Sequence, residues 1–424
     1  MNIAAAILIC LAALNADETP SPQIIIRDAS VFDSITGKMV PNQTIIIEGQ
    51  TITAVDRSSE EVRLNSDAVE IDGSGKYIVP GLVDMHVHAV FVLDGAGIRG
   101  EEALPFYLKC GVTSIRTMGD ALEPVKALAE CAKAEPAKYP QLFLGSPFVD
   151  ADPPFHKGPV SQGIKDPAAV PAFVQEMADA GVTTMKLYMG VNPEVGRAVI
   201  EEAHKRDMTV AGHMVAYPMD QAAQDGIDTV EHVIPWPDKP IGADAAPYAD
   251  ILKAMAEHKA FWTPTLVMMK AMVEGQQFGL ADDPAAAQVP ENLRSLSSGL
   301  LMSFIPAAQR DQLTGVFDTY LQCVKKANDM GIPMLTGTDG AMTLPGISLH
   351  QELELLVQAG LTPAAALQAA TINPARALKQ EQTLGSIEPG KQADLVILDA
   401  NPLDDIKNTR KINTVIHQGQ RCQS

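Results

Sequence analysis

The chain of 424 residues lacks any apolar run long enough to span a bilayer, which takes about 20 residues. It also lacks a C-x-x-C pair, because its five cysteines are scattered, and this excludes a zinc ribbon or a thioredoxin-type motif. Basic residues are scarce: 32 Lys and Arg stand against 52 Asp and Glu, which gives a net charge of −20. This charge argues against nucleic acid and against an anionic membrane surface as partners, since both attract basic proteins.

The N-terminus lacks the basic residues that usually open a signal peptide, because no Lys or Arg precedes Arg27. It does contain an apolar run over residues 3–14, which resembles the central region of a signal peptide, with a cleavage site expected after Ala16. We therefore predict a signal peptide over residues 1–16 and a secreted or periplasmic protein. The alternative is a disordered N-terminus on a cytoplasmic protein.

Both ends of the remaining chain are rich in β-branched residues and turn signals, which is typical of strands. The strand candidates are residues 23–26, 44–48, 51–55, 394–398 and 414–416. The simplest topology joins residues 17–75 and 381–424 into one small β-sandwich domain. Residues 76–380 are then an insertion between its two parts.

In the inserted segment, short apolar runs alternate with longer helical patterns, as they do in βα units around a parallel sheet. The eight strand candidates are residues 77–88, 112–116, 141–145, 183–187, 209–213, 229–232, 260–265 and 332–339. The clearest helix candidates are residues 170–180, 193–205, 244–259 and 319–330. We therefore predict an α/β fold with a (β/α)8 TIM-like barrel, whose usual length is about 250 residues. The loop over residues 274–309 is long enough to form a lid.

Two histidines, His86 and His88, end the first predicted barrel strand. Residues i and i+2 of a strand face the same side, so both imidazoles should point into the mouth of the barrel, where barrel active sites lie. Two convergent imidazoles suit zinc or a similar divalent ion. An HxH pair also occurs by chance, so it does not establish a metal site by itself.

The other strands add residues of the same chemical kind at their carboxyl ends. These are Lys186 on the fourth strand, His213 on the fifth, His232 on the sixth and Asp339 on the eighth. A lysine among core residues needs a specific reason, since an unpaired buried ammonium is costly. The set as a whole favours a metal site.

These motifs resemble the amidohydrolase superfamily, in particular its branch of imidazolonepropionase-like proteins and metal-dependent Xaa-Pro dipeptidases (prolidases). The matching segments are PGLVDMHVH at 80–88, GVTSIR at 111–116, VEH at 230–232, GTD at 337–339, AATINPA at 369–375 and GSIEPGKQADLV at 385–396. The resemblance covers nearly the whole chain after residue 16.

The resemblance implies a binuclear zinc centre. His86 and His88 would hold the more buried ion with Asp339, while His213 and His232 would hold the second. Lys186 would carry a CO2-derived carbamate that bridges both ions, and the hydroxide between the ions would attack the scissile carbonyl. Asp339 would take the proton and deliver it to the leaving amine. The alternative for Lys186 is an uncarboxylated amine that pairs with Asp339 in a one-metal site.

Two further residues are candidates for substrate binding. His156 follows the third strand, in a loop where related dipeptidases often carry a substrate-contacting histidine, although the preceding Pro-Pro-Phe departs from the glycine-rich loop of the family. Tyr188 should face the same side as Lys186 and could donate a hydrogen bond to a substrate oxygen. Arg116 could hold an anionic substrate, or it could be a salt-bridged strand residue.

Several neighbouring residues are interpreted as structural. By strand alternation, Glu231 should point away from the barrel interior. His204 and His258 should lie on the opposite face of the barrel, which serves stability, and His417 should be inert in the tail. His350 lies near the mouth and could be structural or functional.

The sequence therefore predicts a metal-dependent hydrolase of an amide bond, with a dipeptide or an N-acyl amino acid as substrate. An alternative is a hydrolase of a cyclic amide, lactone or other ester with the same metals. A second alternative is a non-catalytic homologue, although such proteins usually lose ligands and this chain keeps all six. The expected partner is a small molecule or short peptide, and a homo-oligomer is left open.

Overall fold

The computed structural model describes residues 23–57, 66–95, 97–232, 244, 248–274, 284–296, 310–340 and 343–422. The predicted signal peptide over residues 1–16 and much of the predicted lid over residues 274–309 lie outside these ranges. Within the described ranges, no helix is both long enough and apolar enough to cross a membrane.

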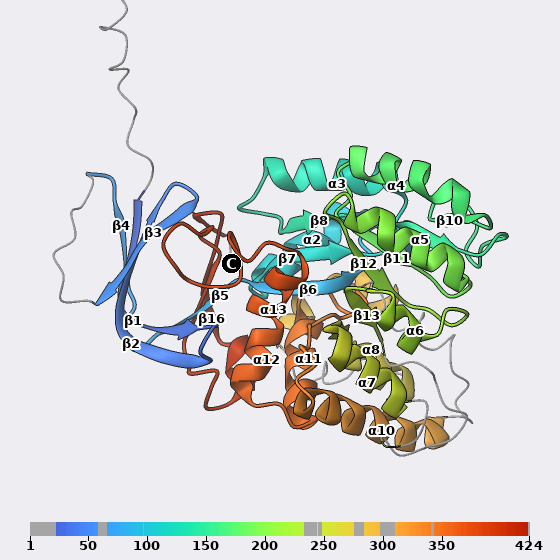
Figure 1. Ribbon diagram of the computed structural model, residues 1–424. Helices are drawn as coiled ribbons and strands as arrows, with labels where there is room; N and C mark the ends of the chain where they lie inside the picture. The colour runs from blue at the N-terminus through green and yellow to red at the C-terminus, as the bar shows by residue number, and fades with distance from the viewer. Residues whose placement is uncertain are drawn as a thin grey trace, which may run out of the picture.

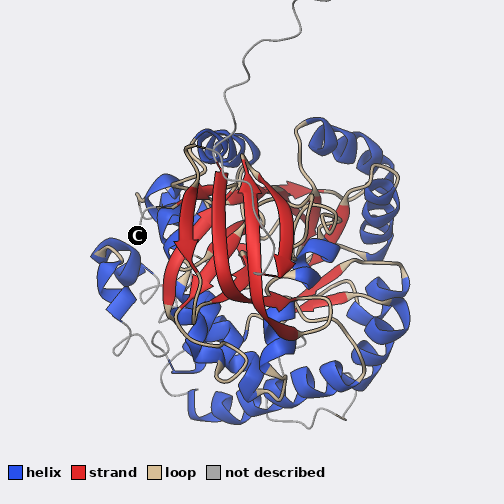
Figure 2. Cartoon of the chain, turned by 90° about the vertical axis from the view of Figure 1, so that its left-hand side faces the viewer, coloured by secondary structure: helices blue, strands red, loops and turns tan. Residues whose placement is uncertain are grey.

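Both ends of the chain build one outer sheet, which faces the viewer in Figure 2. Its members are β1 (Gln23–Asp33), β2 (Lys38–Glu48), β3 (Thr51–Arg57), β4 (Val69–Asp72), β5 (Tyr77–Pro80), β15 (Leu395–Leu398), β16 (Ile412–His417) and β17 (Gln420–Arg421). The order is β17-β16-β15-β5-β1-β2-β3, and β4 pairs with β1. Ile26, Ile45, Ile78 and Ile397 are among its buried core residues. The predicted sandwich is thus one eight-stranded sheet built from both chain ends, rather than two separate sheets.

The middle of the chain forms parallel strands. One sheet holds β6 (Leu82–Val87), β7 (Val112–Thr117) and β8 (Gln141–Phe143). The other sheet runs in the order β10-β9-β11-β12-β13-β14, with β9 (Gly145–Asp150), β10 (Ser161–Gly163), β11 (Thr184–Leu187), β12 (Thr209–Gly212), β13 (Thr229–Glu231) and β14 (Phe261–Thr263). Only Leu144 separates β8 from β9. Parallel bridges from Met334 to Trp262 and from Gly340 to Val87 connect β14 to β6 through residues 334–340.

Helices follow the parallel strands along the chain and pack around them in Figure 1. They are α1 (Phe91–Gly95), α2 (Gly100–Lys109), α3 (Leu122–Ala134), α4 (Val170–Asp179), α5 (Pro193–His204), α6 (Met219–Gln224), α7 (Tyr248–His258), α8 (Leu266–Glu274), α10 (Arg310–Asp329), α11 (Ile347–Gln358), α12 (Pro363–Ala369) and α13 (Ile372–Ala377). Helix α5 shows why they form: the Asn192 side chain caps the backbone N–H of Val195, and Pro193 occupies the first turn. Val195 and Val199, four residues apart, then bury the same face of the helix.

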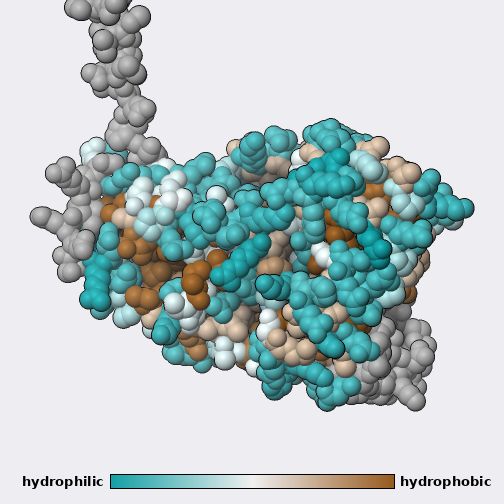
Figure 3. All heavy atoms as spheres, viewed as in Figure 1, coloured by the Kyte–Doolittle hydropathy of each residue, from teal (hydrophilic) through white to brown (hydrophobic). Residues whose placement is uncertain are grey.

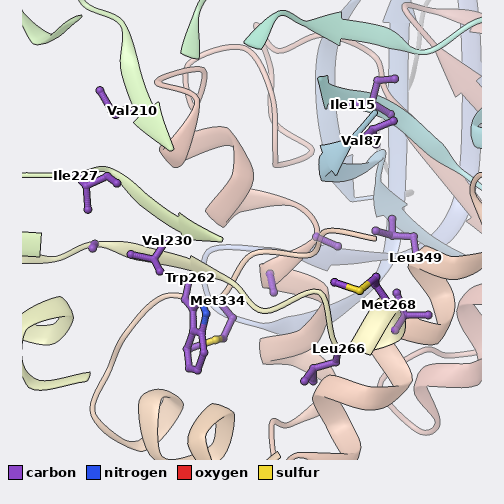
Figure 4. Close-up of a cluster of buried hydrophobic side chains, with 14 of the residues drawn as sticks. Val87, Ile115, Val210, Ile227, Val230, Trp262, Leu266, Met268, Met334 and Leu349 are labelled. Atoms are coloured by element: carbon purple, nitrogen blue, oxygen red, sulfur yellow. The ribbon is translucent and has the colours of Figure 1, made fainter. Parts of the chain in front are cut away.

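Strands and helices share one large apolar core. Figure 4 shows part of it, where the Trp262 ring lies beside Met334. These two residues also form the bridge that joins β14 to residues 334–340. On the face shown in Figure 3, hydrophilic residues cover most of the helical part, and hydrophobic residues gather toward the outer sheet.

Three of the predicted strands differ from the structure. Residues 141–145 span the end of β8 and the start of β9, which belong to different sheets. Residues 77–88 form two strands, because the chain passes from the outer sheet to the parallel sheet at Gly81. A Cβ atom at Gly81 would lie 2.1 Å from Thr113 Oγ1, so only glycine fits this crossing. Residues 332–339 contain one isolated bridge, from Met334 to Trp262, rather than a regular strand. Asp339 has a φ of 53°, which is incompatible with an extended strand.

Candidate metal centre

Three of the predicted ligands form one compact group. The candidate ligand atoms of His86, His88 and Asp339 all lie within 4.8 Å of one another. The Asp339 Oδ1 atom is 3.1 Å from His88 Nε2 and 3.9 Å from His86 Nε2. His86 lies in β6 and His88 directly follows it, so the predicted convergence of the two imidazoles is present.

The other two histidines lie beside this group. The ring centres of His86 and His232 are 4.6 Å apart, and those of His232 and His213 are 4.5 Å apart. His213 follows β12 and His232 follows β13. The ends of three parallel strands therefore bring the four predicted histidines into one continuous cluster.

Lys186, on β11, is buried, and its Nζ atom has no hydrogen-bond partner among the described residues. Burial lowers the pKa of this amine to about 8, although Glu231 and Asp339 favour the charged form. Lys186 pairs with Ala211 of the neighbouring strand β12, two residues before His213, so it lies beside the strand end that carries this histidine. The six predicted metal-ligating residues therefore share one region of the structure.

Three histidines of this region, His86, His213 and His232, favour the neutral form. Burial lowers the pKa of His86 to about 4 and that of His232 to about 3, and nearby positive charge acts in the same direction. Burial also lowers the pKa of His213 well below its usual value. Neutral imidazole is the form that binds metal. Together with the unpartnered Lys186 amine and the His–His–Asp group, this chemistry fits divalent metal ions such as zinc.

Behind His86 lies a buried charged network. His86 Nδ1 is 2.7 Å from Glu231 Oε2, and Arg116 donates to Glu231 Oε1 at 2.7 Å. Arg116 also donates to the carbonyl of Met85 and to Thr229 Oγ1. Burial opposes ionisation of Glu231, but Arg116 and His86 outweigh it and lower the pKa of the carboxyl. Of the two sequence interpretations of Arg116, the structure supports the salt-bridged strand residue.

The prediction that Glu231 points away from the barrel interior is wrong. Glu231 contacts His86 of β6, and its neighbour His232 also lies in the histidine cluster. Strand alternation fails here because His232 has a φ of 64°, in the left-handed region, so the extended backbone ends at Glu231. His232 Nδ1 then lies 2.7 Å from Thr265 Oγ1, a contact that no sequence motif indicated.

Asp84 is another residue whose role the sequence did not reveal. Its carboxyl accepts hydrogen bonds from the Thr338 hydroxyl at 2.6 Å and from the backbone N–H groups of Thr338 and His86. Burial raises the pKa of Asp84 to about 7. Asp84 thus ties β6, which carries His86, to the segment that carries Asp339. The sequence signal for this role was the position of Asp84 two residues before His86, on the same face of the strand.

The two predicted substrate-binding residues lie together. His156 Nε2 is 3.2 Å from the Tyr188 hydroxyl, and the ring centre of Tyr188 is 5.2 Å from that of His213. Burial lowers the pKa of His156 and raises that of Tyr188. The Tyr188 hydroxyl is therefore protonated at neutral pH and can donate a hydrogen bond beside the histidine cluster.

The remaining histidines that were given a structural or open interpretation make local contacts. His350, which was left open, lies 2.9 Å from Thr409 Oγ1 through Nδ1 and 3.0 Å from the Cys110 carbonyl through Nε2. Both ring nitrogens are thus engaged within the fold. His204 bonds Asp228, and His417 bonds Asp394. His258 is the last residue of α7.

The chain is similar to known proteins over much of its length. The amidohydrolase family matches residues 77–422. Imidazolonepropionase of Geobacillus kaustophilus is 26% identical over 413 residues, which cover 85% of this chain and 84% of that protein. Ochratoxinase of Aspergillus niger is 25% identical over 252 residues, 58% of this chain and 44% of that one.

Solved structures share the fold over nearly the whole chain. A protein from Bifidobacterium longum assigned as a prolidase has a TM-score of 0.75 and 25% identity, covering 96% of this chain and 95% of its own. A Xaa-Pro dipeptidase with methionine in its active site has a TM-score of 0.73 and 22% identity, covering 95% of this chain and 100% of its own. These likenesses support the TIM-like barrel. The chain belongs to the amidohydrolase family and is an enzyme that acts on carbon–nitrogen bonds.

Proposed function

We propose that the protein is a metal-dependent hydrolase that cleaves the amide bond of a dipeptide or an N-acyl amino acid with a free carboxylate. The main support is the cluster of His86, His88 and Asp339, whose ligand atoms lie within 4.8 Å of one another. The buried, unpartnered amine of Lys186 beside two further histidines adds to it. The likeness to prolidase-like proteins favours a peptide-like substrate over other amides.

The proposed centre holds two zinc ions. His86, His88 and Asp339 would hold one ion, His213 and His232 would hold the second, and Lys186, as a carbamate, would supply a further oxygen ligand. When bound, such ions supply Lewis acidity, which polarises a carbonyl and lowers the pKa of water. Formation of the carbamate requires a neutral amine, whose nitrogen bonds to the carbon of CO2 and releases a proton. The burial that lowers the pKa of Lys186 to about 8 favours this neutral form.

Asp339 is the proposed proton carrier. Burial opposes ionisation of its carboxyl, but the neighbouring His88, His86 and His232 outweigh it and lower the pKa. The ionised carboxylate can take a proton from the attacking water and pass it to the leaving amine. Its Oδ1 atom, 3.1 Å from His88 Nε2, keeps it at the centre of the cluster.

His156 and Tyr188 are the proposed substrate contacts. The protonated Tyr188 hydroxyl can donate to the carboxylate or the carbonyl oxygen of the substrate. His156, 3.2 Å from that hydroxyl, orients it and adds a second polar group on the same side. These contacts would hold the scissile bond against the metal centre.

A substrate panel on the zinc-loaded protein tests the proposal. The panel contains dipeptides, N-acetyl amino acids, cyclic amides and lactones at equal concentration. We expect the highest kcat/KM for a dipeptide or an N-acetyl amino acid, and a lower value for the same compound with its carboxylate amidated. A higher kcat/KM for a lactone or a cyclic amide would instead assign the same centre to ring opening or ester hydrolysis.

A further inference from the structure

Five rings form a continuous cluster beside the metal centre, here called the aromatic wall. Its members are Phe91, Phe148, Phe155, His156 and Tyr188. They come from separate segments: the start of α1, strand β9 with the loop after it, and the residue after β11. Only 5% of the chain is aromatic, so this gathering at one place is a local feature rather than a general property of the fold.

The wall adjoins the candidate ligands directly. The ring centre of Phe148 is 5.9 Å from that of His88 and 4.2 Å from that of Tyr188. Tyr188 in turn contacts the His213 ring at 5.2 Å. A group bound against these rings would therefore lie next to both pairs of metal-ligating histidines.

The loop that carries the outer part of the wall is held in place by Asp150. The buried Asp150 carboxyl accepts hydrogen bonds from the backbone N–H groups of Phe155 at 2.8 Å and of Gly190 at 2.7 Å. It thereby joins the loop after β9 to the loop after β11. A Cβ atom at Gly190 would lie 2.8 Å from Asp150 Oδ1, so glycine allows this close approach. Phe155 is consequently positioned by the backbone.

Phe155 itself is not part of the apolar core. It is 67% exposed and is the one exposed Phe, Tyr or Trp among the residues that the structure describes. Its ring centre lies 5.0 Å from that of His156 and 6.3 Å from that of Tyr188. An exposed apolar ring beside the polar groups of the proposed site is a combination that small-molecule sites use to bind a ligand.

We propose that the aromatic wall is a substrate subsite that takes an aromatic or large apolar side chain next to the scissile amide. This inference rests on the proposed amide hydrolysis. Phe155 supplies the exposed apolar face of the subsite, and Phe148 supplies the buried one. The polar groups of His156 and Tyr188 remain available to the substrate backbone. A side chain that covers Phe155 removes apolar surface from water on both partners, which favours phenylalanine over alanine at that position.

The test compares Ala-Ala, Phe-Ala and Ala-Phe as substrates of the zinc-loaded wild type and of Phe155→Ala. We expect one of the two phenylalanine dipeptides to have a kcat/KM about tenfold above that of Ala-Ala. In Phe155→Ala this ratio should fall below about threefold. Phe155→Leu, which keeps an apolar side chain, should restore part of the preference.

Val69→Ala serves as the matched control, because Val69 is a 50% exposed apolar residue on the outer sheet. It should leave all three values unchanged. Thermal unfolding of each variant shows whether it is folded, and the exposure of Phe155 makes a folded variant the expected result. The subsite would be overturned if the kcat/KM of the better phenylalanine dipeptide, divided by that of Ala-Ala, were equal in wild type and Phe155→Ala. A wild-type preference for Ala-Ala would overturn it as well.

A binding measurement separates this subsite from the proposed function. Calorimetry compares L-phenylalanine with L-alanine on the zinc-loaded protein, and we expect tighter binding of phenylalanine that is lost in Phe155→Ala. If no dipeptide is hydrolysed but this binding difference is found, the amide hydrolysis is wrong and the subsite stands. If dipeptides are hydrolysed and neither measurement depends on Phe155, the subsite is wrong and the hydrolysis stands.

Discussion

The Nδ1 atom of His86 lies 2.7 Å from Oε2 of Glu231, and both side chains are buried. Arg116 donates to the other carboxylate oxygen at 2.7 Å and keeps Glu231 ionised. An ionised carboxylate facing Nδ1 accepts the hydrogen of that nitrogen, so the lone pair of the neutral ring is on Nε2. The Nε2 atom is the one that faces Asp339, at 3.9 Å. Glu231 therefore leaves the Nε2 lone pair of His86 directed at the proposed metal site.

The first prediction concerns this contact. Glu231→Gln keeps the size of the side chain but removes its charge, so His86 is no longer held in one tautomer. We expect zinc affinity to fall by about 10- to 100-fold, measured by competition with a chromophoric chelator. Glu352→Gln is the control, because Glu352 is also a buried carboxyl but contacts the backbone N–H groups of Leu266 and Val267. Equal zinc affinity in Glu231→Gln and wild type would show that Glu231 does not position His86.

This pair also shows where the sequence was informative. The HxH at 86–88 and the proposed ligands at 186, 213, 232 and 339 could be picked out from strand ends and motifs, because residue types that bind metal are few. The structure brings the four histidines and Asp339 together. The orientation of Glu231 could not be predicted, because it depends on the positive φ of His232, for which strand periodicity gives no signal. The roles of Asp84 and Thr265 could not be predicted for a related reason. They act through contacts with residues distant in sequence.

For the fold, the alternation of strands and helices was sufficient to predict parallel βα units and an outer β domain from both chain ends. The boundary at Gly81 was missed, since residues 77–88 read as one continuous apolar run although the chain changes sheets within it. The single bridges at Met334 and Gly340 could not be anticipated either. Local sequence indicates an extended segment there, while the left-handed φ of Asp339 is imposed by tertiary contacts.

The second prediction concerns proton transfer by Asp339. Asparagine at this position still offers an oxygen ligand but cannot carry the proton to the leaving amine. We expect Asp339→Asn to lower kcat by about 10²- to 10⁴-fold on the best substrate of the panel. Metal content of the same sample, measured by atomic emission, separates lost proton transfer from lost zinc. Near-wild-type kcat at full zinc content would exclude Asp339 as the proton carrier.

The third prediction concerns Tyr188. Removal of its hydroxyl in Tyr188→Phe deletes a hydrogen bond to the substrate without changing the aromatic ring. We expect kcat/KM to fall by about tenfold for a substrate whose free carboxylate accepts this hydrogen bond. The reason is that a hydrogen bond to a charged group contributes about 1.5–3 kcal/mol. Tyr77→Phe, on outer-sheet strand β5, is the control. If both variants behave like wild type, Tyr188 is not a substrate contact.

The fourth prediction concerns Glu352 and pH. Burial raises the pKa of Glu352 from 4.5 to about 8, so between these values the folded protein holds a proton that the unfolded chain releases. Its contribution therefore makes the free energy of unfolding fall as pH rises from about 5 to 8. Glu352→Gln cannot titrate, so its free energy of unfolding should fall less steeply over this range. Urea unfolding of both metal-free proteins at several pH values measures the two slopes, and identical slopes would contradict this role.

The central claim is that the cluster of four histidines, Lys186 and Asp339 is a catalytic metal centre. Its most direct test is hydrolysis of the preferred amide substrate by protein dialysed against a chelator, before and after addition of zinc, with bound metal counted in both samples. We predict that activity disappears with the metal and returns as zinc approaches two ions per chain. Full activity in the metal-free protein would contradict the account.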